Sequence, residues 1–146
     1  ETERQARLER GASYAFRLDM EKAARITGPL TFIEHGRVQS AAPLPFGDIV
    51  IERKEMPTSY HLAVVVDDAH QGVTLVTRGE DLLAATHVQR LLQALLGLAA
   101  PAYAHHRLIA DSKGRTYSKR EDAPTLRSLR AAGLGRDEIR ALFAPV

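Results

Sequence analysis

Three short segments carry residue types suited to binding an anionic substrate: "TSYHLAVVVDD" at 58–68, "TRGEDLL" at 77–83 and "GRTYSKRE" at 114–121. Arg78 lies where an alternating apolar segment meets the start of a helix-like one, the edge at which open α/β sheets bind their ligands. An arginine there can hold a carboxylate through two parallel hydrogen bonds. On spacing alone, a local ion pair of Arg78 with Glu80 or Asp81 is the commoner arrangement.

The third segment is a basic loop, in which Gly114 precedes Ser118, Lys119 and Arg120. Backbone amides near a glycine, together with two cations, suit a polyphosphate, and a loop cation can follow negative charge as it develops. A solvated surface loop explains the same composition about equally well.

Three other groups of polar residues are weaker candidates. The Tyr60 hydroxyl can donate or accept a hydrogen bond at a pocket wall, although a tyrosine beside valines more often lies at the edge of the core. Asp67 and Asp68 are adjacent, so their side chains point apart, and a turn or a helix end explains them better than catalysis does. His105 and His106 are also adjacent, which suits a shared metal ion poorly.

The elements that would position these residues alternate between strands and helices. Residues 73–77 predict a strand, residues 81–96 an amphipathic helix, and residues 105–111 a second strand that leads into the basic loop. Residues 61–69 fit a strand by their valines and a helix by the spacing of their apolar residues, so the pattern leaves both open. Two short helices are expected at the end of the chain, the first of them beginning at Pro124. This order predicts an α/β fold.

The first 55 residues show less periodicity. A helix is expected from Asp19 and a short strand at 49–51, while the first ten residues resemble the flank of a helix. The rest of this part is expected to be irregular, because glycine and proline interrupt it repeatedly.

The bulk composition indicates one ordinary globular domain, with 146 residues of which 45% are hydrophobic. No apolar run is long enough to span a membrane and no secretory signal is visible at the start, so a cytoplasmic location is expected. The sequence contains no cysteine, so neither disulfides nor thiolate zinc sites are expected. The net charge is +2, but residues 105–146 hold nine Lys/Arg against five acids, which suggests a phosphate-bearing partner or a solvated basic face.

In their order and spacing, residues 57–97 and 105–120 resemble the second half of the catalytic domain of glutamyl-tRNA synthetases, and the loop 116–120 resembles the KMSKS signature of class I synthetases. The similarity is greatest to a shortened branch, the glutamyl-Q tRNA(Asp) synthetases. The resemblance implies the second half of a Rossmann-type catalytic domain at 48–122, part of a connecting region at 1–47, and a short helical segment at 123–146. It also favours a helix for the ambiguous valine segment.

The resemblance implies a role for each matching residue. Tyr60 and Arg78 correspond to the pair that recognises glutamate, and Lys119, assisted by Ser118, corresponds to the residue that stabilises charge on the ATP phosphates. The residues expected to bind ATP come from the loop and from the segment before it: Thr116, Tyr117, Lys119, Arg120, Leu108 and Ile109. Thr116 stands where the family usually has lysine, so weaker ATP binding is expected.

The implied reaction is the ATP-dependent activation of glutamate, with Mg²⁺ accompanying ATP, and transfer of the glutamyl group to queuosine in the anticodon of tRNA(Asp). The alternatives are charging of tRNA(Glu) and a non-catalytic RNA-binding relative. Residues 1–47 contain no HIGH motif, so the chain is expected to be the carboxyl-terminal part of a longer enzyme. No zinc and no membrane contact are expected.

Overall fold

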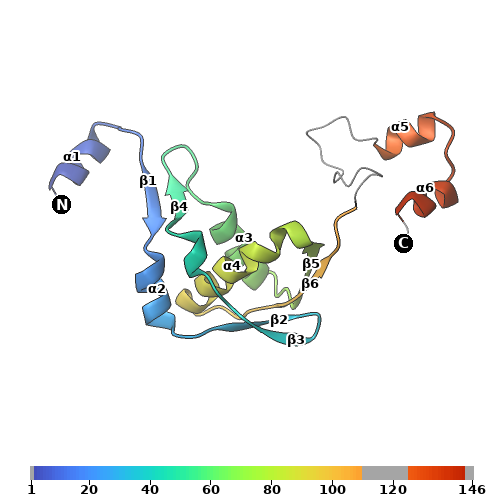
Figure 1. The fold of residues 1–146 in the computed structure, drawn as a ribbon. Helices are drawn as coiled ribbons and strands as arrows, with labels where there is room; N and C mark the ends of the chain where they lie inside the picture. Colours follow the sequence, from blue (N-terminus) through green and yellow to red (C-terminus); the bar gives the residue numbers. More distant parts are fainter. Residues whose placement is uncertain (1, 110–124, 144–146) are drawn as a thin grey trace. The chain divides into compact units, whose positions relative to one another are not determined.

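The computed structural model describes residues 2–109 and 125–143, which fall into two units divided between His106 and Arg107 (Figure 1). The first unit contains α1 (Thr2–Glu9), β1 (Ala15–Leu18), α2 (Met20–Thr27), β2 (Thr31–Glu34), β3 (Arg37–Ser40), η1 (Leu44–Phe46), β4 (Ile49–Arg53), α3 (Tyr60–His70), β5 (Leu75–Gly79), η2 (Glu80–Leu82), α4 (Leu83–Leu95) and β6 (Ala102–His106). The second contains α5 (Leu126–Ala131) and α6 (Arg136–Phe143).

A four-stranded sheet in the order β3-β2-β6-β5 is the frame of the first unit. β5 and β6 run parallel and are joined through α4, as a parallel pair requires a crossover connection. β2 also runs parallel to β6, whereas β3 returns antiparallel to β2. The carboxyl ends of β2, β5 and β6 therefore meet at one edge of the sheet, where ligands of open α/β sheets bind.

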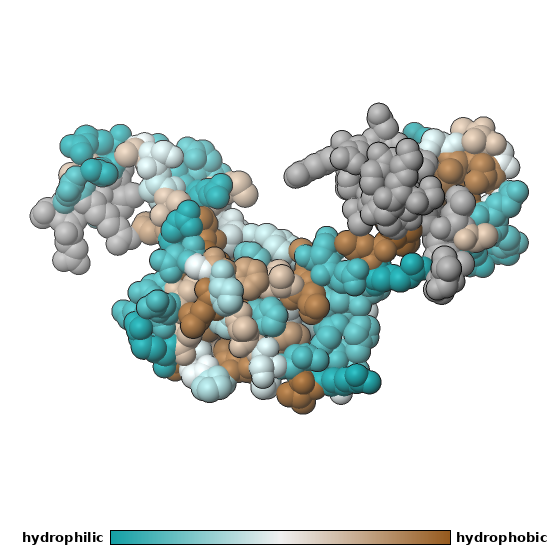
Figure 2. Space-filling model, in the orientation of Figure 1, coloured by the Kyte–Doolittle hydropathy of each residue, from teal (hydrophilic) through white to brown (hydrophobic). Residues whose placement is uncertain are grey.

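The core of this unit forms around α4, which contacts both α2 and α3 (Figure 1). Val88, Leu91 and Leu92 of α4 are buried with Met20 of α2 and Val65 of α3. Their spacing along α4 places them on one face, so the expected amphipathic helix is confirmed. Apolar side chains also reach the surface at several separate places on the face shown in Figure 2.

The valine segment forms a helix, α3, as the family resemblance implies. Ser59 has an extended backbone, and its hydroxyl accepts a hydrogen bond from the backbone N–H of Leu62, which caps the helix start. The preference of valine for strands is overridden because Val65 packs against the core from a helical face.

The prediction of a strand at 105–111 is wrong in its position, because the strand is Ala102–His106. Tyr103 and His105 are buried while the residues between and after them are less so, which is the alternation of a strand. A histidine on the inner face obscured this pattern in the sequence.

The expectation of an irregular first third is also wrong, because residues 15–53 contain four strands. β1 pairs antiparallel with β4, the strand that was expected near 49–51, and α2 begins after Asp19, whose side chain accepts from the N–H of Lys22. The other three strands have four residues each, and β3 is exposed throughout. Such short strands show too little alternation to be recognised.

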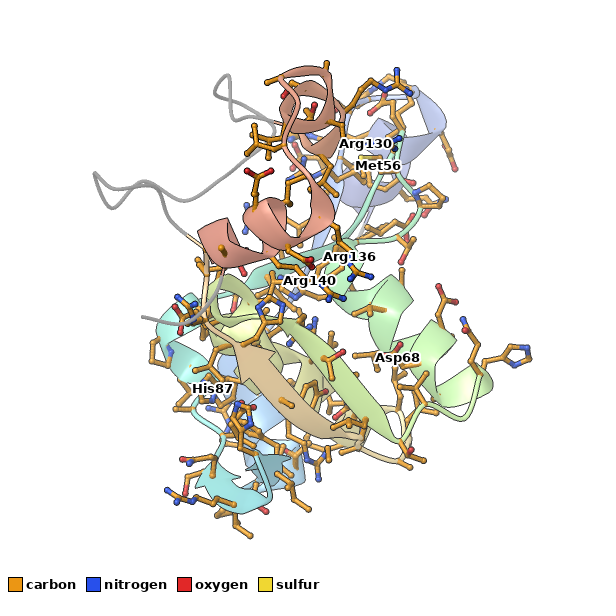
Figure 3. All side chains as sticks on the ribbon, turned by 90° about the vertical axis from the view of Figure 1, so that its right-hand side faces the viewer. Met56, Asp68, His87, Arg130, Arg136 and Arg140 are labelled. Atoms are coloured by element: carbon orange, nitrogen blue, oxygen red, sulfur yellow. The ribbon has the colours of Figure 1, made fainter. Side chains whose placement is uncertain are left out.

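Within its described residues, the second unit contains the two short helices expected at the end of the chain. The first begins at Leu126, with Thr125 as its cap, whereas Pro124, the expected start, lies outside the described residues. Arg130 lies on α5, and Arg136 and Arg140 lie on α6 (Figure 3). Across the described parts of the chain, every helix is too short or too polar to cross a membrane.

Candidate functional site

Arg78, near the carboxyl end of β5, is the centre of a half-buried hydrogen-bond network. Its Nε donates to Nε2 of His105 at 2.9 Å. Its Nη2 donates to Oγ1 of Thr86 at 2.7 Å and to Oε1 of Gln89 at 2.9 Å, and lies 3.2 Å from the carbonyl oxygen of Leu82. Arg78 therefore uses these groups, and not the local carboxylates that its spacing suggested.

Thr86 and Gln89 reach Arg78 from α4, which follows β5 in the chain. They are three residues apart, so they lie on the same side of the helix, and both side chains are buried. Together with His105 they occupy Nε and Nη2, the donors on one edge of the planar guanidinium. Nη1 forms no hydrogen bond within the described residues, so its two N–H groups are the part of Arg78 that a bound carboxylate can use.

His105 connects Arg78 to Glu34, which lies at the end of β2. The Glu34 carboxylate accepts from the backbone N–H of His105 at 2.9 Å and contacts Nδ1 of its ring at 2.7 Å. Because Arg78 Nε is always protonated, Nε2 of His105 must be the acceptor, and the ring carries its proton on Nδ1. The pair is almost closed to solvent, with side-chain exposures of 2% for His105 and 12% for Glu34.

The pKa of Glu34 reflects two opposing effects. Burial raises the pKa of this carboxyl. Hydrogen bonds from the backbone and ring of His105, together with electrostatic effects of His105 and His35, outweigh burial and lower the pKa below its ordinary value. The ionised carboxylate is therefore the stable form in the folded protein.

This shift predicts that Glu34 stabilises the fold at neutral pH and that the contribution is lost in acid. Because the folded pKa is below the unfolded value of about 4.3, the stabilisation is complete above that value and disappears as pH falls through the folded pKa. The free energy of unfolding, measured by urea titration from about pH 6 to about pH 3, is expected to fall more steeply in the wild type than in Glu34→Gln. Equal slopes for the two proteins in acid would contradict this assignment.

The aromatic ring of Tyr103 packs against the guanidinium of Arg78. The guanidinium carbon lies 5.4 Å from the centre of the Tyr103 ring, and the His105 ring stacks on the same tyrosine at a centroid distance of 5.9 Å. The Tyr103 hydroxyl accepts from Nε2 of Gln93 at 3.0 Å, and burial raises the pKa of this hydroxyl. Both Arg78 and His105 therefore pack against the Tyr103 ring.

Helix α3 places its first turn and Asp68 within range of the Arg78 charge. Burial, and then the charge of Arg78, lower the pKa of His61, whose buried Nδ1 has no partner among the described residues. Burial raises the pKa of Asp68, which lies on α3 (Figure 3), and Arg78 opposes that rise. Helix α3 is therefore close enough to Arg78 for its charge to affect both side chains.

Tyr60, the first residue of α3, is 52% exposed, and its ring contacts that of His61. It lies beside a cavity of about 460 Å³, whose other polar lining includes Arg17, Asp48, Glu52, Ser59 and His61. No hydrogen bond or ring contact joins the described side chains of Tyr60 and Arg78. The structure thus brings His61, the neighbour of Tyr60, within range of the Arg78 charge, and places Tyr60 in the lining of the cavity.

The sequence, compared with known proteins, matches the family described as tRNA synthetases class I (E and Q), catalytic domain, over residues 1–141. The chain belongs to this family. Among the relatives of this class I synthetase domain, a glutamyl-Q tRNA(Asp) synthetase of Rhodobacter capsulatus is 55% identical over 97 residues, 66% of this chain and 35% of the relative. The glutamyl-Q tRNA(Asp) synthetase of Nocardia farcinica is 39% identical over 143 residues, 98% of this chain and 44% of the relative.

Solved class I synthetases share the fold. The glutamate-tRNA synthetase of Elizabethkingia anophelis superposes with a TM-score of 0.62 at 26% identity, covering 92% of this chain and 25% of that one. The expected α/β fold of a class I synthetase catalytic domain is thereby confirmed. The chain spans less than half the length of the two curated relatives, which are 35% and 44% covered.

The remaining predicted residues of this synthetase domain are only partly described. Thr116, Tyr117, Ser118, Lys119 and Arg120, the residues of the KMSKS-like loop, lie outside the described residues. Leu108 and Ile109 follow β6; Leu108 is half-buried and Ile109 is exposed. Across the described residues, no group of three or more His, Asp or Glu side chains is arranged to hold a metal ion.

Sequence reasoning missed the partners of Arg78. Glu34 gave no signal, because it lies 71 positions from His105 in an unrecognised strand. Thr86 and Gln89 are three positions apart, so they lie on one side of the predicted helix, but that side is not its apolar face, and the sequence does not mark them as buried. Once the structure shows both to be buried, their spacing explains the shared partner, because a buried polar side chain must be hydrogen-bonded.

Proposed function

We propose that the protein activates glutamate with ATP and transfers the glutamyl group to queuosine in tRNA(Asp). The observation that carries this proposal is Arg78, a half-buried cation whose Nη1 is left unused, among the described residues, at the ligand-binding edge of a class I synthetase fold. A cation anchored in this way suits a substrate with a permanent carboxylate.

In the proposed first step, an oxygen of the glutamate α-carboxylate attacks the α-phosphorus of ATP, and pyrophosphate leaves with the electrons of the broken P–O bond. Because the α-carboxylate reacts, the side-chain carboxylate is the one that can stay on Nη1 of Arg78 throughout. In the second step, a hydroxyl of the acceptor attacks the carbonyl carbon of glutamyl-adenylate, and AMP leaves. Tyr60 is proposed to complete the glutamate site with its hydroxyl.

The ATP site is proposed from the resemblance of the loop. Lys119 would stabilise the negative charge that develops on the phosphates, with Ser118 and Arg120 holding the loop, and Leu108 and Ile109 would pack against adenine. Mg²⁺ is proposed to arrive with the nucleotide, because in such sites it is held largely by the substrate phosphates and water.

The weaker ATP binding expected from Thr116, which stands where the family usually has lysine, can be tested by substitution. Restoring a lysine with Thr116→Lys is expected to lower the KM for ATP roughly two- to fivefold, since an exposed charge pair contributes up to about 1 kcal/mol. The KM for glutamate should stay unchanged. Pyrophosphate exchange at varied ATP measures both constants, and an unchanged KM for ATP would show that position 116 does not face the phosphates.

The acceptor is proposed from the curated relatives, which are named glutamyl-Q tRNA(Asp) synthetases. Four exposed arginines of the second unit fit an RNA partner of either kind: Arg127, Arg130, Arg136 and Arg140. The glutamate-tRNA synthetase neighbour favours the second candidate, charging of tRNA(Glu).

Glutamate-dependent exchange of pyrophosphate into ATP, measured with the complete protein that carries this chain, tests the proposal. Exchange is expected with glutamate alone, without any tRNA. Exchange that requires tRNA(Glu) would support the tRNA(Glu) synthetase, and no exchange under either condition would support a non-catalytic relative.

A further inference from the structure

Three neighbouring strands each contribute one residue to a continuous hydrogen-bonded line. Glu34 comes from β2, His105 from β6 and Arg78 from β5, and these strands are adjacent in the sheet. The line begins in the segment predicted as a connecting region and ends at the cation proposed to bind glutamate. It therefore links two parts of the chain that the sequence treats as separate.

We propose that Glu34 and His105 are positioning residues, which fix the guanidinium plane of Arg78 so that Nη1 faces the side-chain carboxylate of glutamate. This inference rests on the proposed function for its substrate. The geometry of the pair, in contrast, is a property of the described residues alone.

The direction of Nη1 depends on two anchors on the opposite edge of the guanidinium. Thr86 and Gln89 hold Nη2, and His105 holds Nε. With only the Nη2 anchors, the group can still turn about them, because the arginine side chain has several rotatable bonds. The Nε bond removes that freedom, and prior ordering of a binding group strengthens binding by reducing what must be ordered later.

His105 can serve as this anchor only in one tautomer. A neutral imidazole has one donor nitrogen and one acceptor nitrogen, and Arg78 requires the acceptor at Nε2. The Glu34 carboxylate can only accept, so it selects the tautomer with the proton on Nδ1. Glu34 thus determines that the ring nitrogen next to Arg78 is an acceptor, although Glu34 does not contact Arg78 itself.

The substitution Glu34→Gln tests the positioning of Arg78 without breaking the hydrogen bond between β2 and β6. The amide oxygen that this substitution introduces can still accept from the backbone N–H of His105, so the link between β2 and β6 is kept. The new amide nitrogen must then donate to Nδ1, so the ring proton moves to Nε2. Two donors, the Nε2–H of His105 and the Nε–H of Arg78, would then face each other. The strand contact survives, and the anchor for Arg78 is lost.

Two substitutions of His105 form a matched pair. His105→Gln places an amide oxygen near the position of Nε2, and so keeps an acceptor for Arg78 while losing the side-chain contact with Glu34. His105→Asn places its amide near Nδ1, and so keeps the contact with Glu34 while losing the acceptor. Positioning of Arg78 predicts that the glutamine variant is the milder one, and a structural role of the Glu34 contact predicts the reverse.

Steady-state pyrophosphate exchange in the complete protein supplies the first readout. Glu34→Gln and His105→Asn are expected to raise the KM for glutamate about tenfold and His105→Gln less than about threefold, with kcat and the KM for ATP changed less than about twofold. Equal effects of the two His105 variants, a wild-type KM in Glu34→Gln, or a parallel rise in the KM for ATP would overturn the proposal.

A second readout requires no activity. In protein labelled with ¹⁵N-arginine, the Nε–H of Arg78 is expected to exchange slowly with solvent in the wild type and in His105→Gln, and much faster in Glu34→Gln and His105→Asn. Equal exchange rates in all four proteins would refute the positioning pair. If the wild type activates no glutamate, the proposed function fails, and these exchange rates still decide whether Glu34 and His105 hold Arg78.

Discussion

Replacing Arg78 with lysine is expected to raise the KM for glutamate about a hundredfold, because charge-assisted hydrogen bonds contribute about 1.5–3 kcal/mol each and every 1.4 kcal/mol is a factor of ten. An ammonium group lacks the planar fork that reaches His105, Thr86 and Gln89 on one edge and the substrate on the other. The side-chain carboxylate is bound equally in the ground state and the transition state, so kcat should change little.

The matched control for Arg78→Lys is Arg90→Lys. Arg90 lies on α4, and its Nε donates to the backbone carbonyl of Thr31 at 2.8 Å. This control should leave the KM for glutamate within about twofold of the wild type, as substitutions remote from a binding site usually do. Arg78→Lys with a KM no higher than that of the control would remove Arg78 from the glutamate site.

Replacing Lys119 with alanine is expected to act on the rate instead. A lysine that meets charge as it develops contributes mainly in the transition state, and loss of one such group typically lowers kcat by about 10²–10³. The single-turnover rate of glutamyl-adenylate formation should fall by that factor, and the KM for glutamate should stay near the wild-type value. Rapid quench with labelled ATP measures both.

Lys113→Ala is the control for Lys119→Ala, since it removes an equal charge six positions before it. It should slow activation less than about twofold, because Lys113 precedes the KMSKS-like segment 116–120 to which the phosphate contacts are assigned, and a charge farther from the phosphates is more strongly screened. Equal, small losses in Lys113→Ala and Lys119→Ala would show that the loop acts only as a diffuse basic surface.

The sequence predicts Arg78 as a site residue because its position is defined locally. A strand of alternating residues ends near it and an amphipathic helix starts soon after, and both elements are present as β5 and α4. Such a boundary is visible within a window of about 20 residues. What the window cannot show is the direction of the side chain, which depends on residues that reach Arg78 from other strands.

His105 shows the limit of reasoning from neighbours. As half of an adjacent histidine pair it looked like a poor metal ligand, and the sequence did not show which of the two histidines faces the core. Adjacent residues of a strand face opposite sides, so His105 is buried and His106 is exposed. Its partner Glu34 lies 71 positions away, and only the pairing of β2 with β6 brings the two together.

Transfer of labelled glutamate to defined RNAs is the most direct test of the account. With the complete protein, ATP and ¹⁴C-glutamate, label is expected on tRNA(Asp) that carries queuosine and not on the same tRNA with guanosine at that position. Digestion to nucleosides should then place the label on queuosine. Label on the terminal adenosine of tRNA(Glu), with none on queuosine, would contradict the proposed function.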